Sequence, residues 1–170
     1  MKFSTTKTLA LIFLLTACSD DSDDTVSCDR PTKAGIQTID VAQGDLNRPF
    51  SVYVPTTYTG KSAPLVFLLH PSLSSGDITL NSDNFQANAE KNGYIIAAPT
   101  GAVEFGAAFA WNIPGVPLVG AAVYPPDQAP DDIEYIDLAI DAVSEQFCVD
   151  SSRVYATGFS GGGRMSSQLG

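Results

Sequence analysis

Residues 154–170 read VYATGFSGGGRMSSQLG, and this stretch decides which fold the chain can have. Ser160 stands in Gly158-Phe159-Ser160-Gly161-Gly162, which fits the pattern G-x-S-x-G. The segment before it, 153–157, has the composition of a strand, and a helix is predicted from Gly161 onward. The stretch therefore predicts a sharp strand-to-helix turn with Ser160 at its apex. The alternative is a glycine-rich turn that only packs a helix against a sheet.

A serine on such a turn can act as a nucleophile. Its backbone is strained, its hydroxyl is exposed, and glycines flank it because side chains there would collide with neighbouring elements. The N–H of Gly161 would lie at the N-terminus of the next helix, where dipole and hydrogen bond together stabilise a developing oxyanion. Ser160 is therefore the candidate catalytic residue, and Gly161 is a candidate oxyanion-hole donor.

Strand patterns recur upstream of this turn. The segments 65–69 and 94–98 are continuous apolar runs, which are typical of strands buried on both faces of a parallel sheet. Weaker strand patterns cover 36–41 and 50–54. These two are expected to form an antiparallel pair.

Helical patterns separate the strands. A short helix is expected over 84–92, ended by Gly93. A longer helix begins at Asp131 and Asp132, which are good cap and first-turn residues. Its apolar positions recur at helical spacing, namely Ile133, Ile136, Ile140, Val143 and Phe147. This alternation predicts right-handed crossovers and an α/β fold with a mostly parallel sheet.

Two loops are candidate parts of a site. The loop 70–76 follows the most apolar strand, in the place that normally supplies the second oxyanion donor. His70 is the sequence's only histidine, but it precedes Ser160, whereas this type of site takes its partners in the order serine, acid, histidine. We therefore expect His70 to close the strand with a local hydrogen bond. The long segment 101–130 contains the only tryptophan, Trp111, and is expected to be functional or disordered.

Length and charge limit the possible functions. A chain of 170 residues is about one domain long. Its net charge of -10 repels phosphate backbones, and its nine Lys and Arg residues form no basic run. We therefore expect no nucleic-acid partner, and nothing in the sequence calls for a cofactor or a metal.

The N-terminus has the features of an export signal. Residues 1–17 combine a positive leader with a short apolar run, which is too short to span a membrane. The stretch Leu15-Thr16-Ala17-Cys18 resembles the lipobox of bacterial lipoproteins, which predicts a lipidated Cys18 and an extracytoplasmic, lipid-anchored protein at a bacterial outer membrane or cell surface. The polar, acidic segment 18–27 is then an extended tether. An ordinary secretory signal is the alternative.

Two further cysteines, Cys28 and Cys148, follow the tether. An exported protein meets an oxidising compartment, in which disulfides form and persist. The two residues could pair with each other, pair with cysteines beyond residue 170, or remain free thiols. The sequence leaves these three possibilities open.

Four motifs, RVYATGFSGGGRMSS, LVFLLHPS, AWN and DDIEYIDLAIDAV, fall in a familiar order and spacing. Over residues 28–170 the chain resembles the esterases grouped with polyhydroxybutyrate depolymerases, feruloyl esterases and acetylxylan esterases. The resemblance implies the N-terminal part of an α/β-hydrolase fold and a serine esterase acting on polymer-linked esters, with Ser160 as nucleophile. It also implies that Trp111 and Asn112 lie near the substrate cleft. Trp111 as a plain core aromatic is the alternative.

The resemblance is incomplete in two places. The family usually has histidine-glycine where this chain has His70-Pro71, and proline has no N–H to donate. Ser72 is therefore the predicted second oxyanion donor, with Leu73 as the alternative. The family's acid and histidine lie well downstream of the turn, and no histidine follows Ser160 here. We therefore expect the 170-residue chain, truncated just after the turn, to be inactive alone and to fold poorly.

Three interpretations remain open from the sequence. The first is an esterase represented by its N-terminal half. The second is a non-catalytic surface lipoprotein that binds glycan or polyester through the loop around Trp111. The third is an inactive, truncated reading frame.

Overall fold

The computed structural model of the chain describes residues 28, 30, 33–82, 84–118 and 124–170. The predicted signal peptide 1–17, the predicted lipidation site Cys18 and the predicted tether 18–27 lie outside the described residues. No helix in the described ranges is long and apolar enough to cross a membrane.

A five-stranded sheet in the order β1-β4-β6-β5-β9 forms the centre of the fold. Its strands are β1 (Gly35–Ile39), β4 (Phe50–Val54), β6 (Ile95–Ala98), β5 (Ala63–Leu69) and β9 (Val149–Gly158). β5 pairs in parallel with β6 and β9, whereas β4 is antiparallel to β1 and β6. Since β4 alone runs against the other strands of this sheet, the predictions of a mostly parallel sheet and of an antiparallel first pair are confirmed.

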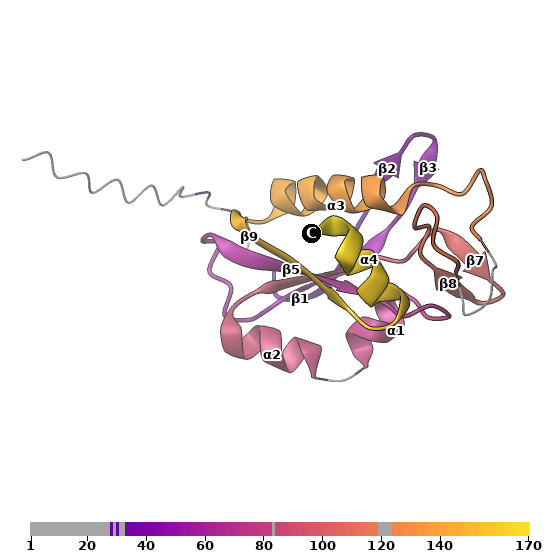
Figure 1. The fold of residues 1–170 in the computed structure, drawn as a ribbon. Coiled ribbons are helices and arrows are strands. Elements are labelled where there is room, and N and C mark those ends of the chain that lie inside the picture. The colour runs from indigo at the N-terminus through magenta and orange to yellow at the C-terminus, as the bar shows by residue number, and fades with distance from the viewer. Residues whose placement is uncertain (1–27, 29, 31–32, 83, 119–123) are drawn as a thin grey trace, which may run out of the picture.

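Helices cover both faces of this sheet (Figure 1). The two short helices α1 (Gly76–Asn81) and α2 (Phe85–Asn92) lie on one face, where Leu80 and Ala89 pack with Leu68 of β5. The helices α3 (Asp132–Gln146) and α4 (Gly161–Leu169) lie on the other face, where they pack on Leu65, Phe67 and Leu69. β5 is buried on both sides because its apolar run supplies side chains to both faces.

The sequence located most helix ends correctly. Gly93 ends α2 in the left-handed conformation, with φ of 70°, which a glycine adopts without steric cost. Asp131 caps α3, because its side chain accepts hydrogen bonds from the N–H groups of Ile133 and Glu134. The buried face of α3 is formed by Asp132, Tyr135, Ile136, Ala139 and Val143, so it is rotated slightly from the predicted apolar stripe.

Three short features escaped prediction. Helix α1 follows the loop 70–75, and two hairpins are formed by β2 (Ala42–Gln43) with β3 (Leu46–Asn47) and by β7 (Val103–Phe105) with β8 (Ala108–Ala110). The described part of the segment 101–130 thus includes a hairpin, which an isolated bridge between Ser74 and Phe109 joins to the loop after β5. Elements of two to six residues are too short to produce a clear apolar period.

Cys28 and Cys148 form a disulfide with 5.7 Å between their Cα atoms, a separation typical of this bond. The sequence had left this pairing open. The bond closes a sequence separation of 120 residues and attaches the N-terminal segment to the junction between α3 and β9.

Candidate active site

Ser160 lies at the apex of the turn between β9 and α4. Its backbone has φ of 54° and ψ of -112°, a conformation that is strained for a residue with a side chain. Within the described structure its hydroxyl makes no capping bond to α4, and the residue is exposed. The predicted strand, turn and helix are therefore all present, with the serine side chain free to meet a substrate.

Two glycines allow this turn to press against the end of β5. A Cβ on Gly158 would lie 2.5 Å from the backbone oxygen of Leu69, and one on Gly162 would lie 2.0 Å from the same atom. Heavy atoms cannot approach so closely, so any side chain at either position would push α4 away from the sheet. The two glycines thus fix where Ser160 stands relative to the loop that follows β5.

That loop brings Ser72 against Gly161. A Cβ on Gly161 would lie 2.8 Å from the backbone nitrogen of Ser72 and 2.4 Å from its Oγ. The two predicted oxyanion donors, which are 89 positions apart in the sequence (161 minus 72), are therefore neighbours beside Ser160. Among the described residues neither of these N–H groups has a hydrogen-bond partner. The Leu73 N–H, the alternative donor, is used in a 2.8 Å bond to the Phe109 oxygen.

The loop containing Ser72 is held from several sides. Leu73 has a φ of 66°, and its backbone strain is balanced by the bond to Phe109 and by a second bond from the Phe109 N–H to the Ser74 oxygen. The Ser72 hydroxyl donates to the Leu118 oxygen at 2.9 Å. The Arg164 guanidinium of α4 donates to the same oxygen at 3.2 Å, so loop and helix share one anchor.

His70 is a structural residue, as predicted. It is fully buried, its Nε2 accepts the Gly101 N–H at 2.9 Å, and its Nδ1 lies 2.8 Å from the Pro71 oxygen. This pattern assigns the proton to Nδ1, which then donates to Pro71. Burial lowers the pKa of His70, an effect that the smaller contribution of the Pro71 hydrogen bond opposes. Both ring nitrogens are thus occupied, and neither is available to take a proton from Ser160.

Trp111 lies buried beneath the loop, whereas Asn112 contacts the segment just before α3. Trp111 is 3% exposed, stacks on His70 with 4.6 Å between ring centroids, and donates its indole N–H to the His70 oxygen at 2.7 Å. Asn112 is partly buried, and its side-chain amide donates to the oxygens of Ala129 and Pro130. Their predicted contact with substrate stays a prediction, and the burial of Trp111 favours the alternative of a core aromatic.

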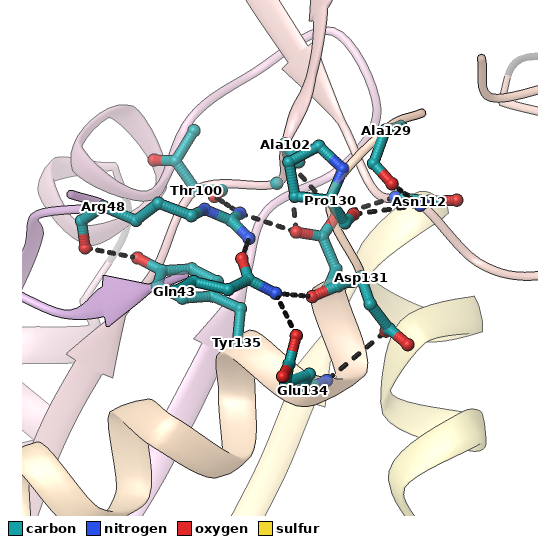
Figure 2. A network of polar contacts seen from close by, with 12 residues as sticks. Gln43, Arg48, Thr100, Ala102, Asn112, Ala129, Pro130, Asp131, Glu134 and Tyr135 are labelled. Carbon is teal, nitrogen blue, oxygen red and sulfur yellow. Dashed lines mark hydrogen bonds and ion pairs between the residues drawn. The ribbon is translucent and has the colours of Figure 1, made fainter. Parts of the chain in front are cut away.

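A buried ion pair between Arg48 and Asp132 was missed by the sequence analysis. Figure 2 shows Arg48 with the labelled residues of the surrounding polar network. Asp132 is fully buried, and its Oδ1 lies 2.6 Å from Nη2 of Arg48. Burial raises the pKa of Asp132, while Arg48 and the N–H groups of Asn112 and Ala102 act in the opposite direction. The only sequence signal was an aspartate in the first turn of a helix, which is the usual surface pattern at that position.

The described residues contain no group of three or more His, Cys, Asp or Glu side chains that could hold a metal ion. The features assembled around Ser160 are instead an exposed hydroxyl, two neighbouring backbone N–H groups and a helix N-terminus. Such a set can attack a carbonyl carbon and stabilise the resulting oxyanion.

Comparison with known proteins relates the chain to an esterase. The chain is 32% identical over 124 residues to feruloyl esterase B of Piromyces equi, an alignment that covers 72% of this chain and 21% of that protein. No protein-family profile matches the sequence. The chain thus spans about a fifth of the length of this curated relative.

Solved structures share the same fold. An acetyl xylan esterase from Aspergillus awamori matches with a TM-score of 0.62 and 18% identity, over 80% of this chain and 46% of that one. A ferulic acid esterase from Anaeromyces mucronatus matches with a TM-score of 0.53 and 22% identity, over 84% of this chain and 56% of that one. The chain therefore has part of the α/β-hydrolase fold. Its sequence is related to that of the Piromyces equi feruloyl esterase.

Proposed function

We propose that the chain is part of a carboxylic ester hydrolase in which Ser160 is the nucleophile. One observation carries the proposal: the strained, exposed Ser160 stands beside Gly161, whose backbone packs against the nitrogen of Ser72. A turn that only packed a helix against a sheet would not require a left-handed φ at a serine. The relationship to a feruloyl esterase supports the same activity.

The proposed reaction proceeds in two steps. Ser160 Oγ attacks the ester carbonyl carbon and gives its proton to a general base, while the N–H groups of Gly161 and Ser72 hold the oxyanion. The tetrahedral intermediate collapses, the alkoxide leaves with that proton, and the acyl group remains on Ser160. Water then attacks the acyl-enzyme and releases the carboxylic acid.

The general base is proposed to lie outside residues 1–170. His70 is the only histidine of this sequence, and its two ring nitrogens bind Gly101 and Pro71. These two contacts fix the orientation of the buried His70 ring. The ring would have to break both of them to reach Ser160. The acid that would orient the base is proposed to lie outside the same residues.

Feruloyl and acetyl esters of plant polysaccharide are the proposed substrates. The sequence relative is a feruloyl esterase, and the structural neighbours include an acetyl xylan esterase and a ferulic acid esterase. The polyester polyhydroxybutyrate, the other substrate class that the sequence resemblance implied, has no counterpart among these names and serves as the contrasting substrate in the test.

The test is a substrate panel for the full-length protein. We expect release of ferulate from methyl ferulate or of acetate from acetylated xylan, and little product from hydroxybutyrate oligomers. Ser160→Ala should remove this hydrolysis, because losing a triad nucleophile costs on the order of 10⁶ in turnover in a well-studied protease. Binding of xylan without hydrolysis by the unmutated protein would instead support the non-catalytic surface lipoprotein.

Anchoring through Cys18 is proposed as well, and it concerns a part of the chain outside the described residues. The lipobox-like stretch 15–18 and the acidic tether support it. Cys18→Ala removes the residue that would carry the lipid, and stable anchoring needs about two acyl chains. The variant should therefore be released from the membrane fraction. Failure of the unmutated protein to incorporate radiolabelled palmitate would contradict the anchor.

A further inference from the structure

Asp132 joins three segments that are distant in the sequence. Its carboxylate accepts hydrogen bonds from the Arg48 guanidinium at 2.6 Å, from the Asn112 N–H at 2.7 Å and from the Ala102 N–H at 3.1 Å. Arg48 follows β3, Ala102 follows β6, and Asn112 follows β8. A fully buried carboxylate with these partners therefore fixes three loops at one point.

Arg48 is itself held in one orientation. Its guanidinium donates to the Gln43 side chain at 2.8 Å and to the Thr100 backbone oxygen at 2.9 Å (Figure 2). It lies 3.5 Å from the centre of the Tyr135 ring, which adds a cation–π contact. The pair of Arg48 and Asp132 thus binds both the oxygen of Thr100 and the N–H of Ala102.

The segment Thr100–Ala102 in turn anchors both ends of the loop that carries Ser72. The Gly101 N–H donates to Nε2 of His70, where the loop begins. The Thr100 hydroxyl accepts the Gly76 N–H at 3.0 Å, where the loop ends and α1 begins. A continuous set of hydrogen bonds therefore connects the buried ion pair to both ends of the loop 70–76, which carries Ser72.

From these contacts we propose that Asp132, together with Arg48, is a positioning residue that sets the place of the Ser72 N–H. The ion pair contacts neither Ser160 nor the oxyanion donors. It acts by fixing the segment 100–102, which is hydrogen-bonded to both ends of the loop that carries Ser72. The catalytic meaning of this inference rests on the proposed function, whereas the mechanical link between ion pair and loop does not.

The mechanical link is tested by amide hydrogen exchange on the full-length protein. Asp132→Asn should raise exchange at least about ten-fold in peptides covering residues 70–76, since an uncharged amide leaves the buried Arg48 without its counter-ion. Asp137→Asn, the same change at an exposed position of α3, is the matched control and should leave exchange unaltered. Unaltered exchange of 70–76 in the Asp132 variant would overturn the proposal.

The catalytic consequence is tested by kinetics on the same variants. Asp132→Asn should lower kcat about ten- to hundred-fold with KM within about three-fold, because a misplaced donor weakens the transition state more than the bound ester. Affinity for a trifluoromethyl ketone, whose adduct with the serine carries an oxyanion, should fall by the same factor as kcat. A fall in kcat with unchanged affinity for the ketone would overturn the proposal.

A milder variant decides the case if Asp132→Asn loosens the whole sheet. Thr100→Val keeps the shape of the side chain and removes only the acceptor for Gly76, so it should raise exchange in 70–76 while β6 and β9 stay protected. Equal protection of the loop in this variant and in the unmutated protein would refute the link. Absence of Ser160-dependent hydrolysis in the unmutated protein would refute the proposed function alone, since the exchange measurements do not depend on turnover.

Discussion

Single residues on the turn between β9 and α4, and on the segments packed around it, determine the geometry around Ser160. A local motif predicted Ser160 and Gly161, whereas Ser72 was predicted from the family resemblance together with the lack of an N–H on Pro71. The partnership of Arg48 and Asp132 could not be predicted, because 84 positions separate the two residues. Neither residue carries a local signal of burial, and only the fold brings them together.

Gly162 is predicted to be intolerant of any side chain. A Cβ there would meet the Leu69 oxygen at 2.0 Å, so Gly162→Ala should lower the free energy of unfolding by about 1–3 kcal/mol. The matched change Gly163→Ala should alter it by less than about 1 kcal/mol, because its nearest atom lies at 3.2 Å and alanine favours the helix. Chemical denaturation of both variants measures the difference. Equal stabilities would mean that the turn is not closely packed.

The burial of His70 should lower the free energy of unfolding in mild acid. Since burial lowers its pKa in the folded state below the unfolded value of about 6.5, the unfolded chain binds the proton first as the pH falls. The contribution of His70 is therefore fully present above pH 6.5 and decreases below it, by at most about 1.4 kcal/mol per pH unit.

The check is a comparison of unfolding curves between pH 7.5 and pH 5.5 for the unmutated protein and for His70→Asn, which does not titrate there. The variant should be less stable at pH 7.5 and should show a smaller slope with pH. Parallel slopes would mean that His70 titrates alike in the folded and unfolded states.

At the scale of elements, the length and composition of each segment decided what the sequence could reveal. β5 was predicted because its apolar run is continuous, and α3 because its apolar side chains recur at helical spacing after a capping residue. α1 and the β7–β8 hairpin were missed because contacts with other segments hold them in place. Gly76, for instance, packs so closely that a Cβ would lie 2.0 Å from the Ala98 oxygen.

The disulfide between Cys28 and Cys148 should stabilise the fold. Because Cys28 and Cys148 close a separation of 120 residues, replacing both by serine should lower the free energy of unfolding by about 2–4 kcal/mol. Reductant should destabilise the unmutated protein by a similar amount and leave the double variant unchanged. Stability that is insensitive to reductant would show that the bond is not formed in solution.

At the scale of the whole molecule, the order β1-β4-β6-β5-β9 with helices on both faces places the C-terminal ends of β5 and β9 side by side. The register pairs Leu69 with Gly158, so the loop after β5 and the turn after β9 leave the sheet at the same edge. Ligands of open α/β sheets bind at that edge. The proposed esterase site is therefore where this fold would put it, although its residues come from distant parts of the chain.

The central claim, that Ser160 is an activated nucleophile, is tested most directly by labelling the full-length protein with a fluorophosphonate. Attack by the serine oxygen on phosphorus expels fluoride and leaves a stable adduct, which mass spectrometry can locate. Trypsin releases the peptide VYATGFSGGGR, residues 154–164, in which Ser160 is the only serine. We predict one adduct on this peptide, at Ser160, and none in Ser160→Ala. An unlabelled peptide, or an adduct that persists in the variant, would contradict the account.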